Sequence, residues 1–594
     1  MKQLEQSPLP QNASPPWPLA TALRETFREG YTFSDFRQDA AGGIVTGIVA
    51  VPLSMALAIA VGVPPQHGLY TAIVAGGLTA LLGGAKTSVS GPTAAFVVIL
   101  APIAARYGIA GLCIASTMAG IILILLGIAK LGKLIEFVPH PVTTGFTSGI
   151  AVVIATLQIK DFLGLQVEHM PDQYVERLLV LGRAVPSLNL SDLVVGVAAL
   201  AMLIIWPQIS KRIPAALLAL FVVAVVSFAV QRVYPDFNPG TINDGRFVYT
   251  TAAGEQAAGI PNTPPVPILP WHLPGPGPSA EPLVFDMALI RALLMPAIAI
   301  AMLGAIESLL CAVVADGMTG EKHDPDSELI AQGLGNISAS FFSGFAATGA
   351  IARTATAIRA GAKSPIASFI HAAFVLLAIL VLSPLLGYLP MASLAALMLI
   401  VAWNMSDLRH FAQIIRVAPR SDIVVLLTCF LLTVFFDMVV SVVTGGMLSA
   451  VLFMGRMAQI SGTRVVSGTH PQLVAPLPQG VLLYEVHGPL FFGAAEKAAS
   501  AILTADRSVK AIVLHMVDVP IMDVTGLVAL QSAIDKLRHG GVFVVLAEVQ
   551  QQPSELLKQA GLTAEPGKLA ICDSLEQAET MVRLALPKQR KDKA

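Results

Sequence analysis

The sequence predicts an α-helical polytopic membrane protein that carries a small α/β domain in its C-terminal part. Of its 594 residues, 55% are hydrophobic and only 13% are charged, whereas a soluble protein carries about 25% charged residues. Apolar runs near the ~20 residues that span a bilayer as a helix recur from Gly42 to Met454. After Met454, short Val- and Ile-rich runs alternate with helical periodicity. This composition excludes a single water-soluble globule and a disordered chain.

The membrane part is predicted to contain fourteen helical segments, and an even number of crossings places both ends of the chain on one side. A loop rich in proline and glycine, from Pro235 to Pro282, separates two halves of seven segments each. The segments are Gly42–Val61, Gly68–Leu82, Thr93–Ala105, Ala110–Ile128, Val138–Leu157, Leu193–Trp206, Pro214–Val230, Ala288–Val314, Leu329–Phe345, Ile351–Ala360, Pro365–Leu385, Met391–Val401, Ile423–Phe436 and Met438–Met454.

The distribution of basic residues predicts that both termini are cytoplasmic. Residues 1–34 contain no apolar region of the kind found in a signal peptide, so we expect a short cytoplasmic tail there. The short outside loops then hold little beyond Arg106, and a basic tail follows at 587–594. The inside loops receive Lys86, Lys130, Lys133, Lys211, Arg212, Lys322, Arg359, Lys363, Arg409, Arg416 and Arg420.

The third segment of each half is short and follows a glycine-rich turn, SVSGPTAAF at 88–96 and ATGAIARTA at 347–355. Broken helices at matching positions indicate an inverted-repeat transporter with a site near the membrane midplane. Two helix N-termini that face each other would offer free N–H groups and positive dipole ends to a small anion. The alternative is an ordinary Gly-Pro loop at the membrane edge.

Three side chains are candidates for the site. Thr93 would add a hydroxyl donor, and Arg353 would pair with a carboxylate or sulfate in a bidentate manner. The alternative for Arg353 is a topology charge or a snorkelling side chain. Glu307 lies deep in the apolar stretch MLGAIESLLCAVVA, where acids usually mark ion pathways. It could take up a proton, hold Na⁺, or be a neutral acid hydrogen-bonded to a neighbouring helix.

The C-terminal part is predicted to be a cytoplasmic α/β domain over residues 474–586. The strand-like runs VLLYEVHGPLFFG, AIVLHMVDVP and VFVVLAEV alternate with AAEKAASAIL, TGLVALQSAIDKLRHG and PSELLKQAG, which have helical spacing. Asp523 stands where a strand meets a helix, so we expect it to cap that helix and to leave Thr525 exposed in the first turn.

Several chemistries are excluded by the sequence. Cys113, Cys311, Cys429 and Cys572 are far apart and none lies in a CxxC, so packing is their expected role. The eleven histidines show no metal-binding spacing, and we assign no metal ligand and no cofactor. With no nucleophile–base pair or phosphate loop, the chain is not expected to be an enzyme. The net charge of −1 gives no reason to expect a nucleic-acid partner.

The stretches VPLSMALAIAVGVPPQHGLYTA, SVSGPTAAFVVILAP, FTSGIAVVIATLQIKDFLGL, GAIESLLCAVVADGMTG and ELIAQGLGN with IARTAT closely resemble the sulfate permease (SulP) family of anion transporters. The region with Asp523-Val524-Thr525-Gly526 resembles the STAS domain attached to such transporters. Within the family, the sequence looks most like the DauA-type transporters of C4-dicarboxylates in bacterial inner membranes. The transmembrane domain is then expected over 35–460.

The resemblance implies two intertwined inverted repeats that form a core domain and a gate domain. It implies that the third and tenth segments hold the substrate, at Thr93, Ala352 and Arg353, with Glu307 for cation coupling. Ser54 and Leu57 of the first segment would line the same cavity. It also implies a homodimer, a cytosolic protein partner for the STAS domain, and phosphorylation at Thr525.

Two departures from the family pattern favour an organic anion over sulfate. This chain has Pro52-Leu53-Ser54 where many sulfate-type members have Pro-Gln-Gly, and Ala352 where a serine often precedes the arginine. We expect a proton-coupled dicarboxylate (succinate, fumarate, aspartate) transporter that works by alternating access. One alternative is a Na⁺-coupled bicarbonate or sulfate symporter, and another is a membrane scaffold that acts through its STAS protein-binding domain.

Overall fold

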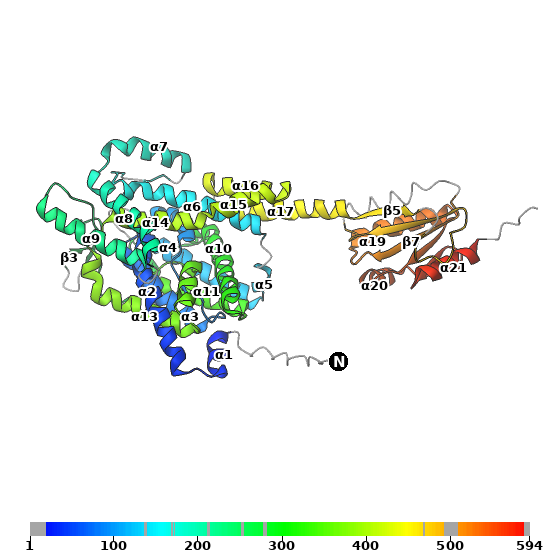
Figure 1. Cartoon of the computed structure of the whole chain (residues 1–594), viewed down its shortest axis with the longest axis horizontal. Coiled ribbons are helices and arrows are strands. Elements are labelled where there is room, and N and C mark those ends of the chain that lie inside the picture. The colour runs from blue at the N-terminus through cyan, green and yellow to red at the C-terminus, as the bar shows by residue number, and fades with distance from the viewer. Residues whose placement is uncertain are drawn as a thin grey trace, which may run out of the picture. The chain divides into compact units, whose positions relative to one another are not determined.

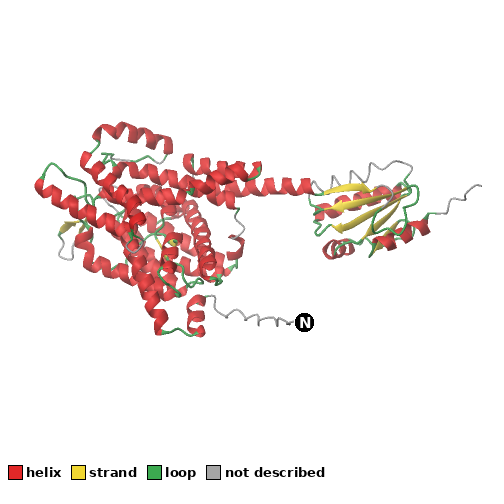
Figure 2. Ribbon diagram, in the orientation of Figure 1, coloured by secondary structure: helices red, strands yellow, loops and turns green. Residues whose placement is uncertain are grey.

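The computed structural model describes residues 19–135, 139–167, 170–171, 173–210, 214–250, 255–276, 282–436, 438–466, 470–491 and 509–586. The chain forms two compact units, Met1–Gly446 and Met447–Ala594. The first is built almost entirely of helices, and the second combines a sheet with helices (Figure 1, Figure 2). Most of the predicted N-terminal tail, the basic C-terminal tail and the helix predicted at 494–503 lie outside the described residues.

The predicted helical membrane fold is confirmed. Among the described residues, nine spans are long and apolar enough to cross a bilayer. The α-helices before the sheet of the second unit are α1 (Thr21–Glu29), α2 (Phe33–Val61), α3 (Pro65–Leu82), α4 (Ala94–Ile128), α5 (Gly132–Ile135), α6 (His140–Phe162), α7 (Tyr174–Ala184), α8 (Leu190–Ile209), α9 (Ala215–Val233), α10 (Met287–Thr319), α11 (Pro325–Phe341), α12 (Ile351–Arg359), α13 (Pro365–Leu386), α14 (Met391–Ser406), α15 (Leu408–Val417), α16 (Arg420–Phe435) and α17 (Met438–Ile460).

Each of the fourteen predicted segments corresponds to a helix or to half of one. The third and fourth segments are the two halves of α4, which is broken at Gly108 (φ 65°, ψ −167°). Helix α2 begins well before the predicted Gly42, because Thr32 and Asp35 form a capping box that starts it in a polar stretch. The short helices α1, α5, α7 and α15 were not predicted, because none contains an apolar run of bilayer length.

Two groups of helices pack within the first unit, and they match the core and gate domains that the resemblance implies. Helices α2, α3, α4, α10, α11, α12 and α13 contact one another, as do α6, α8, α14 and α16. Helix α4 meets α11 through glycines: a Cβ on Gly333 would lie 2.5 Å from the carbonyl oxygen of Gly120. Small residues of this kind let membrane helices approach closely.

The second unit is a five-stranded sheet with helices on both faces (Figure 2). Its strands are β5 (Gly462–Val466), β6 (Val481–His487), β7 (Ala511–Asp518), β8 (Phe543–Ala547) and β9 (Leu569–Cys572), in that spatial order. The pair β5–β6 is antiparallel and the other pairs are parallel. Because side chains alternate along a strand, those of β7 pack on α19 (Val524–His539) on one face and on α21 (Leu575–Ala585) on the other. Helix α20 (Gln551–Gln559) precedes β9.

Candidate functional site

Two strands of two residues each hold the starts of α4 and α12 together. Strand β1 (Ser90–Gly91) pairs antiparallel with β4 (Thr348–Gly349). The N–H of Ala350 also donates to the carbonyl of Val89 at 2.9 Å. Each strand leads directly into its helix, and among the described residues neither helix start has a side-chain cap. The positive ends of two helix dipoles and their free N–H groups are therefore brought to one place.

Thr93 and Glu307 meet at the start of α4. Thr93 stands at the N-cap position, but its hydroxyl donates to Glu307 Oε2 at 3.0 Å. Both side chains are half-buried. Because α10 brings Glu307 from the other half of the sequence, the carboxylate is placed next to the two helix ends. Glu307 and Thr93 are therefore in direct contact beside the start of α4.

Arg353 ties α12 to the turn that precedes α4. Its side chain is 2% exposed, and one terminal nitrogen (NH2) donates to the carbonyl of Pro92 at 2.5 Å. The other terminal nitrogen lies so close to Gly91 that a Cβ there would be 2.6 Å from it. Within the described part of the chain, that nitrogen and Nε have no hydrogen-bond partner. The guanidinium is therefore buried against the turn Gly91–Pro92 that precedes α4.

A set of polar side chains supports the two strands, and sequence reasoning missed it. Gln332 of α11 accepts from the Ser90 hydroxyl at 2.8 Å and donates to the carbonyl of Ala347 at 2.7 Å. Ser308 of α10 contacts the Thr348 hydroxyl at 2.8 Å and accepts from the Gly349 N–H at 3.2 Å. The available signal was that Ser308 directly follows Glu307 in an apolar helix.

The remaining candidates lie in α2 and in the first turn of α12. Ala352 is exposed and carries no polar group, so it leaves the end of α12 open. Ser54 and Leu57 are both buried in α2, a helix that contacts α4 and α12. The Ser54 hydroxyl has no hydrogen-bond partner among the described residues, and α3 packs on its main chain at Gly68.

In the second unit the predicted helix cap is confirmed. The Asp523 carboxylate accepts from the Gly526 N–H at 2.7 Å and caps α19, and Thr525 is exposed in the first turn. The four cysteines are free and buried, consistent with packing. The fold also brings together His470, Glu485 and His515, whose separation in the sequence gave no metal-binding pattern.

Comparisons with known proteins agree with this architecture. The profile of the Sulfate permease family matches residues 36–429, and that of the STAS domain matches 472–578. The chain is 38% identical over 545 residues to the putative sulfate transporter YvdB of Bacillus subtilis, covering 91% of this chain and 96% of the relative. It is 31% identical over 530 residues to the bicarbonate transporter BicA of Picosynechococcus, covering 85% and 87%.

Two solved structures share the fold. The overall structure of SLC26A9 superposes with a TM-score of 0.80 at 18% identity, covering 95% of this chain and 93% of that one. The transmembrane domain of a cyanobacterial bicarbonate transporter BicA gives a TM-score of 0.59 at 26% identity, covering 69% and 98%.

The fold and the pair of half-helices define a multi-pass membrane transporter of anions with a C-terminal STAS domain, not an enzyme. The chain belongs to the sulfate permease family.

Proposed function

We propose that the protein is a secondary active transporter that moves a small dicarboxylate, such as succinate, fumarate or aspartate, together with a proton. The observation that carries this proposal is the contact of Thr93 with Glu307 beside the starts of α4 and α12. An ionised Glu307 would repel an anion held at the helix ends, and a proton on Glu307 removes that repulsion. Binding of the anion and of the proton therefore favour each other.

The substrate preference is inferred from what surrounds the helix ends. Ala352 offers no polar group in the first turn of α12, and Leu53 replaces a polar residue of the sulfate-type pattern in α2. A carboxylate would take the N–H groups, and its carbon chain would contact these apolar side chains. Arg353 is proposed to pair with the anion, because Nε and one terminal nitrogen of its buried guanidinium have no hydrogen-bond partner among the described residues. Ser54 and Leu57, buried here, are proposed to line the cavity in another state of the transport cycle.

Na⁺-coupled transport of bicarbonate or sulfate fits the same site equally well. The relatives named above are described as sulfate and bicarbonate transporters. The carboxylate of Glu307 and the hydroxyl of Thr93, 3.0 Å apart, are oxygen ligands of the kind that hard cations prefer. In this alternative Glu307 holds Na⁺ in place of a proton.

Uptake into proteoliposomes separates these two functions. Labelled succinate, sulfate and bicarbonate are offered with an inward proton gradient, with and without Na⁺. Succinate uptake that follows the proton gradient and ignores Na⁺ supports the proposal, and sulfate or bicarbonate uptake that requires Na⁺ supports the alternative. Glu307→Gln should abolish accumulation driven by the proton gradient and retain exchange down a concentration gradient. Full pH-driven accumulation by Glu307→Gln would remove Glu307 from the coupling role.

We further propose that the protein lies in a bacterial inner membrane with both termini in the cytoplasm and works as a homodimer. The positive-inside distribution of Lys and Arg supports the orientation. Accessibility of single cysteines placed at residues 20 and 586 to a membrane-impermeant reagent, in intact and in opened cells, tests it. The exposed Thr525 at the start of α19 is proposed as a phosphorylation site that controls contact with a cytosolic protein, which phosphopeptide mapping tests.

A further inference from the structure

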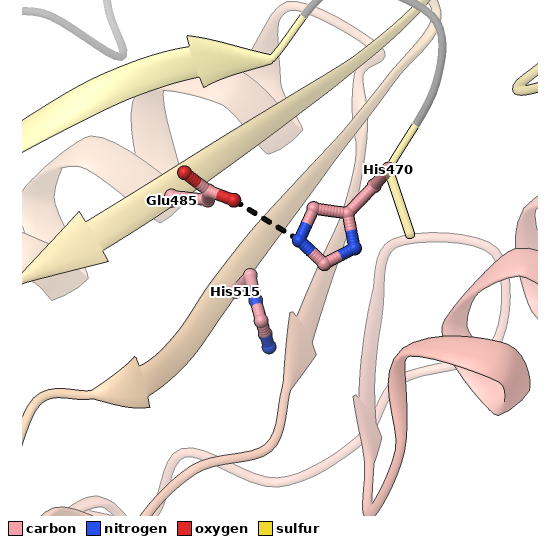
Figure 3. A group of neighbouring side chains, drawn as sticks. All are labelled: His470, Glu485 and His515. Carbon is pink, nitrogen blue, oxygen red and sulfur yellow. Dashed lines mark ion pairs between the residues drawn. The ribbon is translucent and has the colours of Figure 1, made fainter. Parts of the chain in front are cut away.

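Three potential metal ligands converge in the STAS domain (Figure 3). Glu485 of β6 and His515 of β7 are register partners on adjacent parallel strands, and His470 comes from the segment between β5 and β6. One ligand atom of each residue lies within 4.8 Å of the other two. His470 Nε2 is 3.1 Å from Glu485 Oε1. Glu485 and His515 meet because their strands are in register, although they are far apart in the sequence.

The group is shielded from solvent, although it lies at the surface of a sheet. The side chain of His515 is 5% exposed, that of His470 13% and that of Glu485 18%. Partly buried polar groups of this kind need partners. A bound divalent cation would supply one partner to all three side chains.

Further side chains orient two of the ligands, His515 and Glu485, as outer partners do in metal sites. His515 Nε2 is 3.0 Å from Glu548 Oε2, which leaves Nδ1 as the other ring nitrogen that can bind a metal. The second oxygen of Glu548 accepts from the Leu575 N–H at 3.1 Å, which fixes this carboxylate. His487 contacts the Glu485 carboxylate, with its Nε2 3.5 Å from Glu485 Oε2, and its Nδ1 is 2.9 Å from Asp518 Oδ2.

We propose that the STAS domain binds one Zn²⁺ ion through His470, Glu485 and His515. Two imidazoles and one carboxylate form a ligand set that zinc uses, with a fourth position left for water. The same set disfavours Mg²⁺ and Ca²⁺, which prefer oxygen ligands alone. His470 Nε2 and Glu485 Oε1 are 3.1 Å apart, close to the separation of two ligands on a tetrahedral Zn²⁺ ion. The ion would then fix the segment before β6 to the sheet.

Zinc binding is measured on the full-length protein, purified in detergent with a histidine-free affinity tag and stripped with a chelator. Titration with ZnCl₂ should give one ion per chain, and Co²⁺ should give the visible absorption of a four-coordinate site. His470→Ala and Glu485→Gln should each weaken Zn²⁺ binding at least tenfold. His470 is half-buried outside the strands, so its replacement leaves the sheet core intact. His539→Ala, at the exposed end of α19, is the matched control and should bind like the parent.

Thermal unfolding gives a second measurement that does not depend on transport. Zn²⁺ should raise the melting temperature of the parent and of His539→Ala, because a ligand that binds only the folded state stabilises it. Zn²⁺ should leave the melting temperature of His470→Ala unchanged. One zinc ion per chain retained by both His470→Ala and Glu485→Gln, or no binding by the parent, would overturn the proposal, as would preferential binding of Mg²⁺ or Ca²⁺.

Discussion

Thr93 combines two tasks at the start of α4. Its backbone has the extended conformation of an N-cap, while its hydroxyl contacts a carboxylate from the other half of the chain. A residue that capped its own helix would have satisfied one of the free N–H groups. Because Thr93 does not, those groups have no side-chain cap among the described residues, and the hydroxyl donates to Glu307.

Replacement of Thr93 separates the hydroxyl from the shape of the side chain. Thr93→Val should raise the KM for the anion several-fold and shift the pH dependence of uptake, because the contact with Glu307 is lost. Thr93→Ser keeps the hydroxyl and should behave much like the parent. Uptake assayed from pH 5 to 8 in proteoliposomes measures both effects. Equal behaviour of the two variants would show that the contact has no part in transport.

Position 91 requires glycine, both because of its backbone angle and because the Arg353 side chain lies next to it. It adopts φ +154°, and a Cβ there would lie 2.6 Å from the Arg353 guanidinium. We expect Gly91→Ala to displace Arg353 and to reduce uptake at least tenfold, with a loss of stability of about 1–3 kcal/mol. Gly62→Ala is the control, since Gly62 also has a positive φ (+92°) but has no atom within 4 Å of the added Cβ. A similar loss of uptake in both variants would exclude the guanidinium contact as the cause.

At the scale of elements, the close approach of α4 and α11 sets the position of the candidate site. Thr93 is the N-cap residue of α4, and Gln332 of α11 hydrogen-bonds to Ser90 and to the carbonyl of Ala347. The two helices meet where Gly120 and Gly333 face each other. A side chain at this contact would push the helices apart.

Gly333→Ala tests this helix contact. The added Cβ would lie 2.5 Å from the Gly120 carbonyl oxygen, so we expect a destabilisation of about 1–3 kcal/mol. This destabilisation is measured by thermal unfolding in detergent, monitored through the reaction of the buried cysteines with a fluorescent thiol reagent. Gly182→Ala in α7, with open space around the Cβ, should leave the melting temperature unchanged or slightly higher. A melting temperature of Gly333→Ala equal to the parent's would contradict the packing described.

The elements that sequence reasoning found are those with a long local signal. Apolar runs located all fourteen segments, and the Asp523 cap followed from the residue types at a strand–helix junction. The strands β1 and β4 are two residues long, and their pairing depends on chain segments more than 250 residues apart, so no local pattern specifies them. The burial of Arg353 and the meeting of His470 with His515 depend on tertiary packing in the same way.

At the scale of the whole molecule, the candidate transport site and the STAS domain belong to separate compact units. Thr93, Glu307 and Arg353 all belong to the unit Met1–Gly446, while the STAS domain has its own hydrophobic core on both faces of its sheet. The residues of the candidate anion site therefore all come from the first unit.

Removal of the chain after Ser461 should therefore preserve anion binding. We expect the truncated protein to bind the transported anion with a Kd within about threefold of the full chain, measured by the ligand-induced shift of its melting temperature. Glu307→Gln in the same truncated background is the comparison that reports a damaged site. A truncated protein that is folded but no longer binds any of the three test anions would assign the STAS domain an essential part in the site.

The pairing of β1 with β4 would restrict how an anion leaves the proposed site between the starts of α4 and α12. Drawing the two helix ends apart would break main-chain hydrogen bonds between Val89–Gly91 and Thr348–Ala350 in a place without water to replace them. Release by that route is costly. We therefore expect the starts of α4 and α12 to stay paired and to move as one rigid body, with the anion bound, relative to the group α6, α8, α14 and α16.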